Sequence, residues 1–109
     1  MKKISPSHYK ARAKIMKALA HPTRLFIIDM LADGEKCVCE LNRMIDADGS
    51  TVSKHLAVLR DSGLVDDEKR GLNVYYRLKC PCALNFMTCV EDVIKSNLDD
   101  QVNLTGWKP

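Results

Sequence analysis

The 109-residue chain contains no run of about 18 apolar residues, the length that a membrane-spanning helix requires. The basic start MKKIS does not lead into the uninterrupted apolar stretch of a signal peptide. We therefore expect a cytoplasmic protein with no membrane partner. Hydrophobic residues make up 46% of the chain and charged residues 28%, which is ordinary for a single folded domain.

Acidic residues are missing from the first part of the chain. Residues 1–24 carry seven Lys or Arg and no acid, and all 14 Asp and Glu lie from Asp29 onward. A basic segment of this kind favours an anionic partner such as nucleic acid, and a merely solvated charged face is the alternative.

The sequence also lacks the C-x-x-C motif that thiol-disulfide enzymes usually carry near a βαβ pattern, so we expect no enzyme. In a reducing cytoplasm, an odd number of cysteines favours free thiols, metal ligands or redox groups. The five cysteines are Cys37, Cys39, Cys80, Cys82 and Cys89. A disulfide between the first two is not expected, because side chains two residues apart in a helix do not face each other.

Hydrophobic spacing predicts four helices in the first part of the chain. The first covers residues 9–20, the second runs from Pro22 to a Gly34 cap, the third is CVCELNRMI, and the fourth follows Asp48 as N-cap. Apolar residues at helical spacing define the expected inward faces of the last three. These are Leu25, Ile28 and Leu31, then Val38, Leu41 and Ile45, then Val52, Leu56 and Leu59.

From Leu64 the apolar period changes to two, which predicts a hairpin with Lys69 and Arg70 at its tip and the inward residues Leu72, Val74, Tyr76 and Leu78. A last helix follows, and residues 99–109 are expected to form a loose tail after a domain over residues 1–98. The order of elements predicts a mainly α fold with a small β-hairpin, a winged helix-turn-helix.

The fourth helix has an unusual outer face for a helix that only meets solvent. Its first two turns carry small or hydrogen-bonding residues that can reach phosphates or base edges. These candidates for DNA contact are Ser50, Thr51, Ser53, Lys54 and His55. Ordinary surface polarity is the alternative.

Four segments together resemble the ArsR/SmtB family of metal- and thiol-responsive bacterial repressors: LAHPTRLFIIDML, EKCVCEL, STVSKHLAVLRDSGLV and VYYRL. The resemblance covers residues 10–98. It implies a homodimer in which the first and last helices pair, with the fourth helix in the major groove of operator DNA and the hairpin along the flanking backbone. The acids Asp66, Asp67 and Glu68 would repel phosphates, which limits wing contacts to Lys69 and Arg70.

The resemblance also implies that Cys37 and Cys39 bind a thiophilic inducer, either arsenite or a soft divalent ion such as Cd, Zn or Pb. Arsenite repressors of this type often have a third cysteine where this chain has Asn42, so the third thiol has to be Cys89 or, less favoured, Cys80 or Cys82. Related zinc sensors use histidines of the last helix, which this chain lacks. Oxidation or persulfidation of the same thiols is the alternative, and a structural zinc module is a further one.

Overall fold

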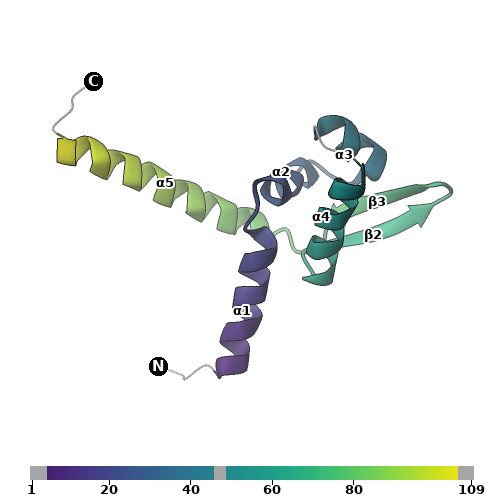
Figure 1. Ribbon diagram of the computed structural model, residues 1–109, viewed down its shortest axis with the longest axis horizontal. Helices are drawn as coiled ribbons and strands as arrows, with labels where there is room; N and C mark the ends of the chain where they lie inside the picture. The colour runs from purple at the N-terminus through teal and green to yellow at the C-terminus, as the bar shows by residue number, and fades with distance from the viewer. Residues whose placement is uncertain (1–4, 46–48, 106–109) are drawn as a thin grey trace.

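The computed structural model describes residues 5–45 and 49–105 (Figure 1). The elements in chain order are α1 (Pro6–Leu19), α2 (Pro22–Leu31), β1 (Lys36–Cys37), α3 (Val38–Met44), α4 (Gly49–Asp61), β2 (Val65–Arg70), β3 (Asn73–Leu78) and α5 (Ala83–Thr105). This order confirms the predicted mainly helical fold with a hairpin wing. Among the residues that the structure describes, no helix combines the length and apolarity needed to cross a membrane.

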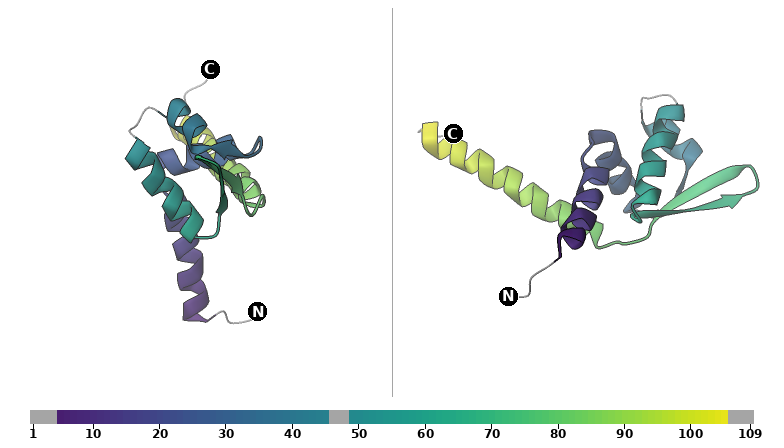
Figure 2. Two further views of the ribbon diagram at one scale, coloured as in Figure 1. Left: turned by 90° about the vertical axis from the view of Figure 1, so that its right-hand side faces the viewer. Right: turned by 60° about the horizontal axis from the view of Figure 1, so that its bottom comes forward.

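The molecule has a packed body and two projecting helices. In Figures 1 and 2, α2, α3, α4 and the sheet lie together, while α1 and α5 extend away from them. The radius of gyration is 17.3 Å, whereas a compact domain of this length has about 13 Å. The extended shape therefore comes from helices that are only partly packed within one chain.

The core forms where α2, α3, α4 and the sheet meet. The predicted inward residues of α4, which are Val52, Leu56 and Leu59, are each 0% exposed, as is Leu41 of α3. The prediction for α2 was partly wrong: Ile28 and Leu31 are buried, but Leu25 is 36% exposed and Ile27 is 0% exposed instead. Both α1 and α4 pack against α2, so the inward face of α2 includes a position that the i, i+3 pattern omits.

The sheet has three strands in the order β1-β3-β2, and all pairs are antiparallel. β1 was not predicted, because a strand of two residues is too short to show an alternating pattern. Tyr76 of β3 is buried as predicted, but Leu72 is fully exposed because it lies in the turn before the strand begins. Gly71 forms this turn at φ 61°, a conformation that L side chains rarely adopt.

Two predictions about boundaries have different outcomes. Gly63 follows α4 at φ 84°, as expected for the residue that ends the helix. The loose tail was wrong for residues 99–105, because α5 continues to Thr105. The predicted N-cap Asp48 lies outside the described residues.

Candidate nucleic-acid interface and thiol site

The outer face of α4 is polar over its first turns, as the sequence suggested. Ser50, Ser53 and Lys54 are exposed and Thr51 is half-buried, while the opposite side of the helix is packed into the core. The buried residues recur every three or four positions, which leaves the intervening polar side chains on the solvent side. This face carries most of the α4 side chains that the sequence predicts to contact a nucleic acid.

His55 is half-buried beside the core face of α4 rather than opposite it, and its contact with DNA stays a prediction. Its ring packs against the ring of His21, with centroids 4.4 Å apart, and its Nδ1 lies 3.4 Å from Nη1 of Arg24. Burial lowers the pKa of His55, and the nearby His21 and Arg24 lower it further. His55 therefore connects α4 to the start of α2, where His21 caps the helix by accepting from the backbone N–H of Thr23.

The acids of the first wing strand are paired with arginines of the same chain. Arg60 donates to Asp67 at 3.1 Å, and Arg77 lies 4.0 Å from both Asp66 and Glu68. These partners reduce the repulsion that the acids would exert on a phosphate backbone.

The two candidate residues at the wing tip differ in their surroundings. Lys69 is exposed, whereas Arg70 is held by carboxylates of Glu35 and Glu68 at 2.6–3.0 Å. Pairing with these acids raises the pKa of Arg70 above its ordinary value, and the same contact lowers the pKa of Glu35. Arg70 thus has intramolecular partners that a phosphate would have to replace.

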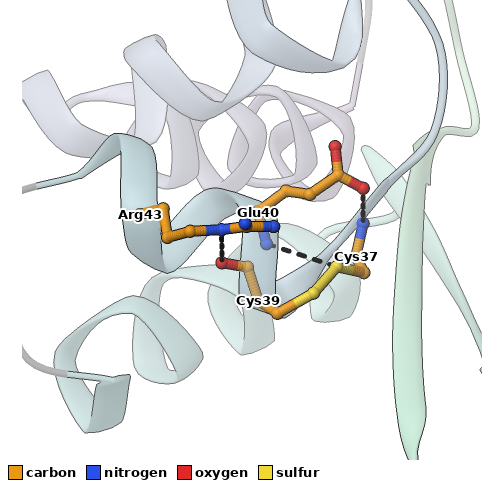
Figure 3. Close-up of a disulfide and its surroundings, with 4 residues drawn as sticks. All are labelled: Cys37, Cys39, Glu40 and Arg43. Carbon is orange, nitrogen blue, oxygen red and sulfur yellow. Dashed lines mark hydrogen bonds between the residues drawn. A yellow bond between two sulfur atoms is a disulfide. The ribbon is translucent and has the colours of Figure 1, made fainter.

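The cysteine pair lies at the start of α3 (Figure 3). Cys37 is the N-cap, with φ −76° and ψ 157°, and its Sγ accepts from the Glu40 N–H at 3.2 Å. Glu40 Oε1 in turn accepts from the Cys37 N–H at 3.3 Å, which completes a capping box. The first turn of α3 therefore depends directly on the Cys37 sulfur.

Cys37 and Cys39 form a disulfide, with their Cα atoms 5.2 Å apart. The prediction that this pair would not bond was wrong, because it assumed that both residues are helical. Cys37 has extended backbone and pairs with Tyr75 in the sheet, so the side-chain directions of a helix do not apply to it. A soft ion would bind the reduced pair, in which both sulfurs are thiolates.

The two cysteines of the pair differ in solvent exposure. Cys37 is 4% exposed, whereas Cys39 is exposed and lines a hollow of about 390 Å³ together with Ser53 of α4 and Asn73 of the wing. A reagent can therefore approach Cys39 from the same side as the polar face of α4. This proximity places the thiol chemistry next to the candidate nucleic-acid interface.

The structure does not bring a third thiol to this pair. Cys80, Cys82 and Cys89 are all free and exposed; the first two lie just before α5 and Cys89 lies on it. Within residues 5–45 and 49–105, no three His, Cys, Asp or Glu side chains are grouped so that they could hold a metal ion. The predicted third ligand Cys89 therefore does not reach Cys37 within the single chain described.

The sequence did not predict four contacts of the site. Glu40 follows Cys37 by three residues, which is the spacing of a capping box and could have been recognised. The contacts of His21 and Arg24 with His55 and of Glu35 with Arg70 join residues 31 to 35 positions apart in the chain. No local pattern predicts such contacts.

Comparisons with known proteins agree with this geometry. The family model described as "Bacterial regulatory protein, arsR family" matches residues 21–67. The arsenical resistance operon repressor of Escherichia coli K12 is 47% identical over 66 residues, which cover 60% of this chain and 56% of that protein. The chain likewise spans only 51–58% of the other curated relatives that match most strongly.

Solved structures match over more of the chain. Rv0081 of Mycobacterium tuberculosis is 30% identical with a TM-score of 0.78, and the match covers 91% of this chain and 99% of that one. Mb0332 of Mycobacterium bovis, described as a homodimeric winged helix-turn-helix DNA-binding domain, is 29% identical with a TM-score of 0.75. That match covers 92% of this chain and 95% of the solved one.

Proposed function

The chain belongs to the ArsR family of bacterial regulatory proteins, and we propose that it is a homodimeric transcriptional repressor that leaves its operator when Cys37 and Cys39 bind a thiophilic species such as arsenite. The observation that carries this proposal is the shared hollow in which Cys39 lies beside Ser53 of α4. The inducer contacts and the DNA contacts are thus adjacent, so a change at one alters the other.

For DNA binding, we propose that the outer face of α4 enters the major groove. Hydroxyl groups of Ser50, Thr51 and Ser53 donate to phosphates or base edges, and Lys54 supplies a positive charge. Lys69 and Arg70 extend the contact to the flanking backbone from the wing. A dimer of such units requires an operator with inverted half-sites about one helical turn, or a multiple of it, apart.

For the dimer, we assign the interface to α1 and α5. The α5 residues Phe86, Val90, Val93 and Ile94 are 40–59% exposed in the single chain, and Ile15 and Met16 of α1 are 36% and 54% exposed. Apolar side chains at helical spacing along one face require a partner, and a second copy supplies the same face.

The DNA assignment is tested by comparing Lys54→Ala with Lys95→Ala, a matched loss of one exposed Lys from α5. We expect Lys54→Ala to weaken DNA binding. The slope of log affinity against log salt concentration should become less steep by about 0.9, because one phosphate contact is lost. Lys95→Ala should leave both quantities unchanged. The measurement is fluorescence anisotropy with a duplex selected from random sequence, over a range of salt concentrations. Equal slopes for Lys54→Ala and the unmodified protein would remove this residue from the interface.

For the inducer, the reduced Cys37 and Cys39 supply two thiolates, and arsenite takes three. We assign the third thiol to Cys89, with Cys80 and Cys82 as alternatives. Because these cysteines lie on or just before α5, the α1–α5 dimer interface is the route by which a second copy could bring one of them to the pair. Cadmium, zinc and lead ions have the same preference for sulfur and are the other inducers considered.

The disulfide between Cys37 and Cys39 supports a second candidate, a repressor that responds to oxidation. In that reaction the two thiols lose two protons and two electrons to a hydroperoxide, whose O–O bond is cleaved, and one S–S bond forms. A persulfide donor is the other reagent of this kind. The same hollow admits either reagent to Cys39.

Cysteine variants separate these candidates. Reduced Cys37→Ser and Cys39→Ser should each bind DNA normally yet keep it when arsenite is added, because arsenite takes three thiols and each variant leaves only two. Among Cys80→Ser, Cys82→Ser and Cys89→Ser, only one should show the same loss, and the other two serve as controls. The readouts are operator affinity and the intact mass of the adduct. Normal release by both Cys37→Ser and Cys39→Ser would reject ion sensing at this pair. Release by hydroperoxide alone, with loss of two hydrogens in mass, would establish the oxidative candidate.

A further inference from the structure

Arg70 forms a bridge across the sheet that the proposed function does not use. It ends β2, and its guanidinium donates to both carboxylate oxygens of Glu35, from Nη1 at 2.6 Å and from Nη2 at 3.0 Å. Nη2 also donates to Glu68 at 2.8 Å, and the guanidinium carbon lies 4.7 Å from the centre of the Tyr75 ring. The partners thus come from β2, from β3 and from the segment that enters β1.

The contact with Glu35 joins the end of one outer strand of the sheet to the residue that precedes the other. β3 lies between β1 and β2, so Arg70 has to reach over the central strand to meet Glu35. The ring of Tyr75 on β3 lies beneath the guanidinium, and Tyr75 is also the residue that pairs with Cys37. The bridge therefore spans the sheet beside Cys37, only two residues after Glu35.

Other charges on this part of the sheet surround the bridge. Arg77 lies 4.0 Å from Glu68 and adds a positive charge near Glu35, while Asp66 faces Arg77. A single exposed ion pair contributes little to stability, but a bidentate Arg–carboxylate contact within a network fixes the relative orientation of the two groups. Its effect is to fix where the wing lies relative to the cysteine segment.

We propose that Glu35 is a positioning residue that ties the wing to the cysteine segment through Arg70, so that a change at Cys37 moves the wing as well as α3 and α4. This inference rests on the proposed function, because it describes how the same thiol site is coupled to DNA. When Cys37 changes its partner, the residues before it shift, and the Glu35 carboxylate no longer meets Arg70 in the same geometry. The wing then loses its position along the DNA backbone.

Glu68 offers a matched control for Glu35. Glu35→Gln and Glu68→Gln each remove one negative charge and one partner of Arg70, but only Glu35 belongs to the cysteine segment. Both variants should therefore change basal DNA affinity in the same direction. Only Glu35→Gln should uncouple the wing from the thiols.

The first test measures the ratio of operator affinities without and with arsenite for the reduced full-length protein. The unmodified protein should give a ratio of about 5 to 150. Glu35→Gln should reduce the ratio by about threefold or more while still forming the arsenite adduct by mass, and Glu68→Gln should stay within about twofold of the unmodified protein. An undiminished ratio in Glu35→Gln would overturn the inference. Absence of release from the unmodified protein would instead reject the proposed function.

A second measurement does not depend on arsenite or DNA. The Arg70 Nε–Hε resonance is followed by NMR while a dithiol reductant opens the Cys37–Cys39 disulfide, which yields two thiols and the cyclic disulfide of the reductant. The resonance should shift in the unmodified protein and in Glu68→Gln, and it should not shift in Glu35→Gln. A shift of equal size in Glu35→Gln, or no shift in the unmodified protein, would overturn the inference.

Discussion

The apolar residues of the molecule's body and those of its two projecting helices differ in how far a single chain buries them. In the body, Ile27, Leu41 and Leu56 are 0% exposed within a single chain. On α5, by contrast, Val93 is 59% exposed and Ile94 is 48% exposed. The body thus has a complete small core, whereas the apolar face of α5 is left uncovered in the single chain. The comparison indicates that the body folds locally, and in the function proposed above α1 and α5 serve for assembly.

The two regions also differ in how their charges are arranged. The wing and the start of β1 hold arginines and acids in pairs, such as Arg60 with Asp67 and Arg70 with Glu35. The cations of α1, which include Lys10, Lys14 and Lys17, are exposed on a helix whose first turn contains no acid. The wing charges are therefore largely paired within the chain, whereas the first turn of α1 offers its cations no acid, as a segment expected to meet an anionic partner would.

The largest expected effect is a difference between the two regions in how a core substitution changes the free energy of unfolding. Leu56→Ala should lower the free energy of unfolding by about 2–5 kcal/mol, because it leaves a cavity in a core that is complete in one chain. Val93→Ala removes apolar surface that one chain leaves exposed, so its cost should appear only where dimers form. Urea unfolding at two protein concentrations measures both variants. A loss for Leu56→Ala that disappears at high concentration would contradict the division into two regions.

The next effect concerns assembly. Val90→Glu places a charge on the apolar face of α5, and we expect the dimer dissociation constant to rise by about a hundredfold or more, because an unpaired carboxylate would be buried in the interface. The circular dichroism of the helical body should not change. Glu91→Gln, a substitution at the neighbouring position, is the control and should leave the dimer intact. Sedimentation velocity over a range of concentrations measures the change, and an unaltered dimer in Val90→Glu would place the interface elsewhere.

Much of the body could be predicted from the sequence because its signals are local. The spacing of Val52, Leu56 and Leu59 identified the inward face of α4, and the position of Gly63 identified its end. Leu25 and Leu72 were assigned wrongly because periodicity identifies a face but not which neighbour covers it. The covered face of α2 is decided by α1 and α4, and Leu72 lies in a turn where the alternation stops.

The thiol site shows where local reasoning fails. A disulfide was not expected because helical spacing was assumed for Cys37, whereas the residue is an N-cap that pairs with Tyr75, nearly forty positions later. Likewise, the sequence predicted Arg70 only as a cation at the wing tip, because no nearby residue in the sequence indicates a contact with Glu35. Contacts between distant segments depend on the assembled fold and have no periodic signature. The roles of the cysteines and of the α4 side chains therefore remain predictions for the experiments above.

The smallest expected effect tests the link between α4 and α2. Burial, and to a smaller extent the neighbouring His21 and Arg24, lower the pKa of His55 below its ordinary value of 6.5. Below about pH 6.5 the unfolded chain therefore binds a proton more readily than the folded chain, so stability is present at higher pH and declines as the pH falls towards the folded pKa. His55→Gln should flatten the dependence of the urea midpoint between about pH 7.5 and about pH 5.5. His8→Gln, which changes an exposed histidine of α1, should retain the dependence of the unmodified protein. If His55→Gln and the unmodified protein lose stability in parallel, the cluster of His21, Arg24 and His55 does not respond to protons, and its role is limited to packing α4 against the start of α2.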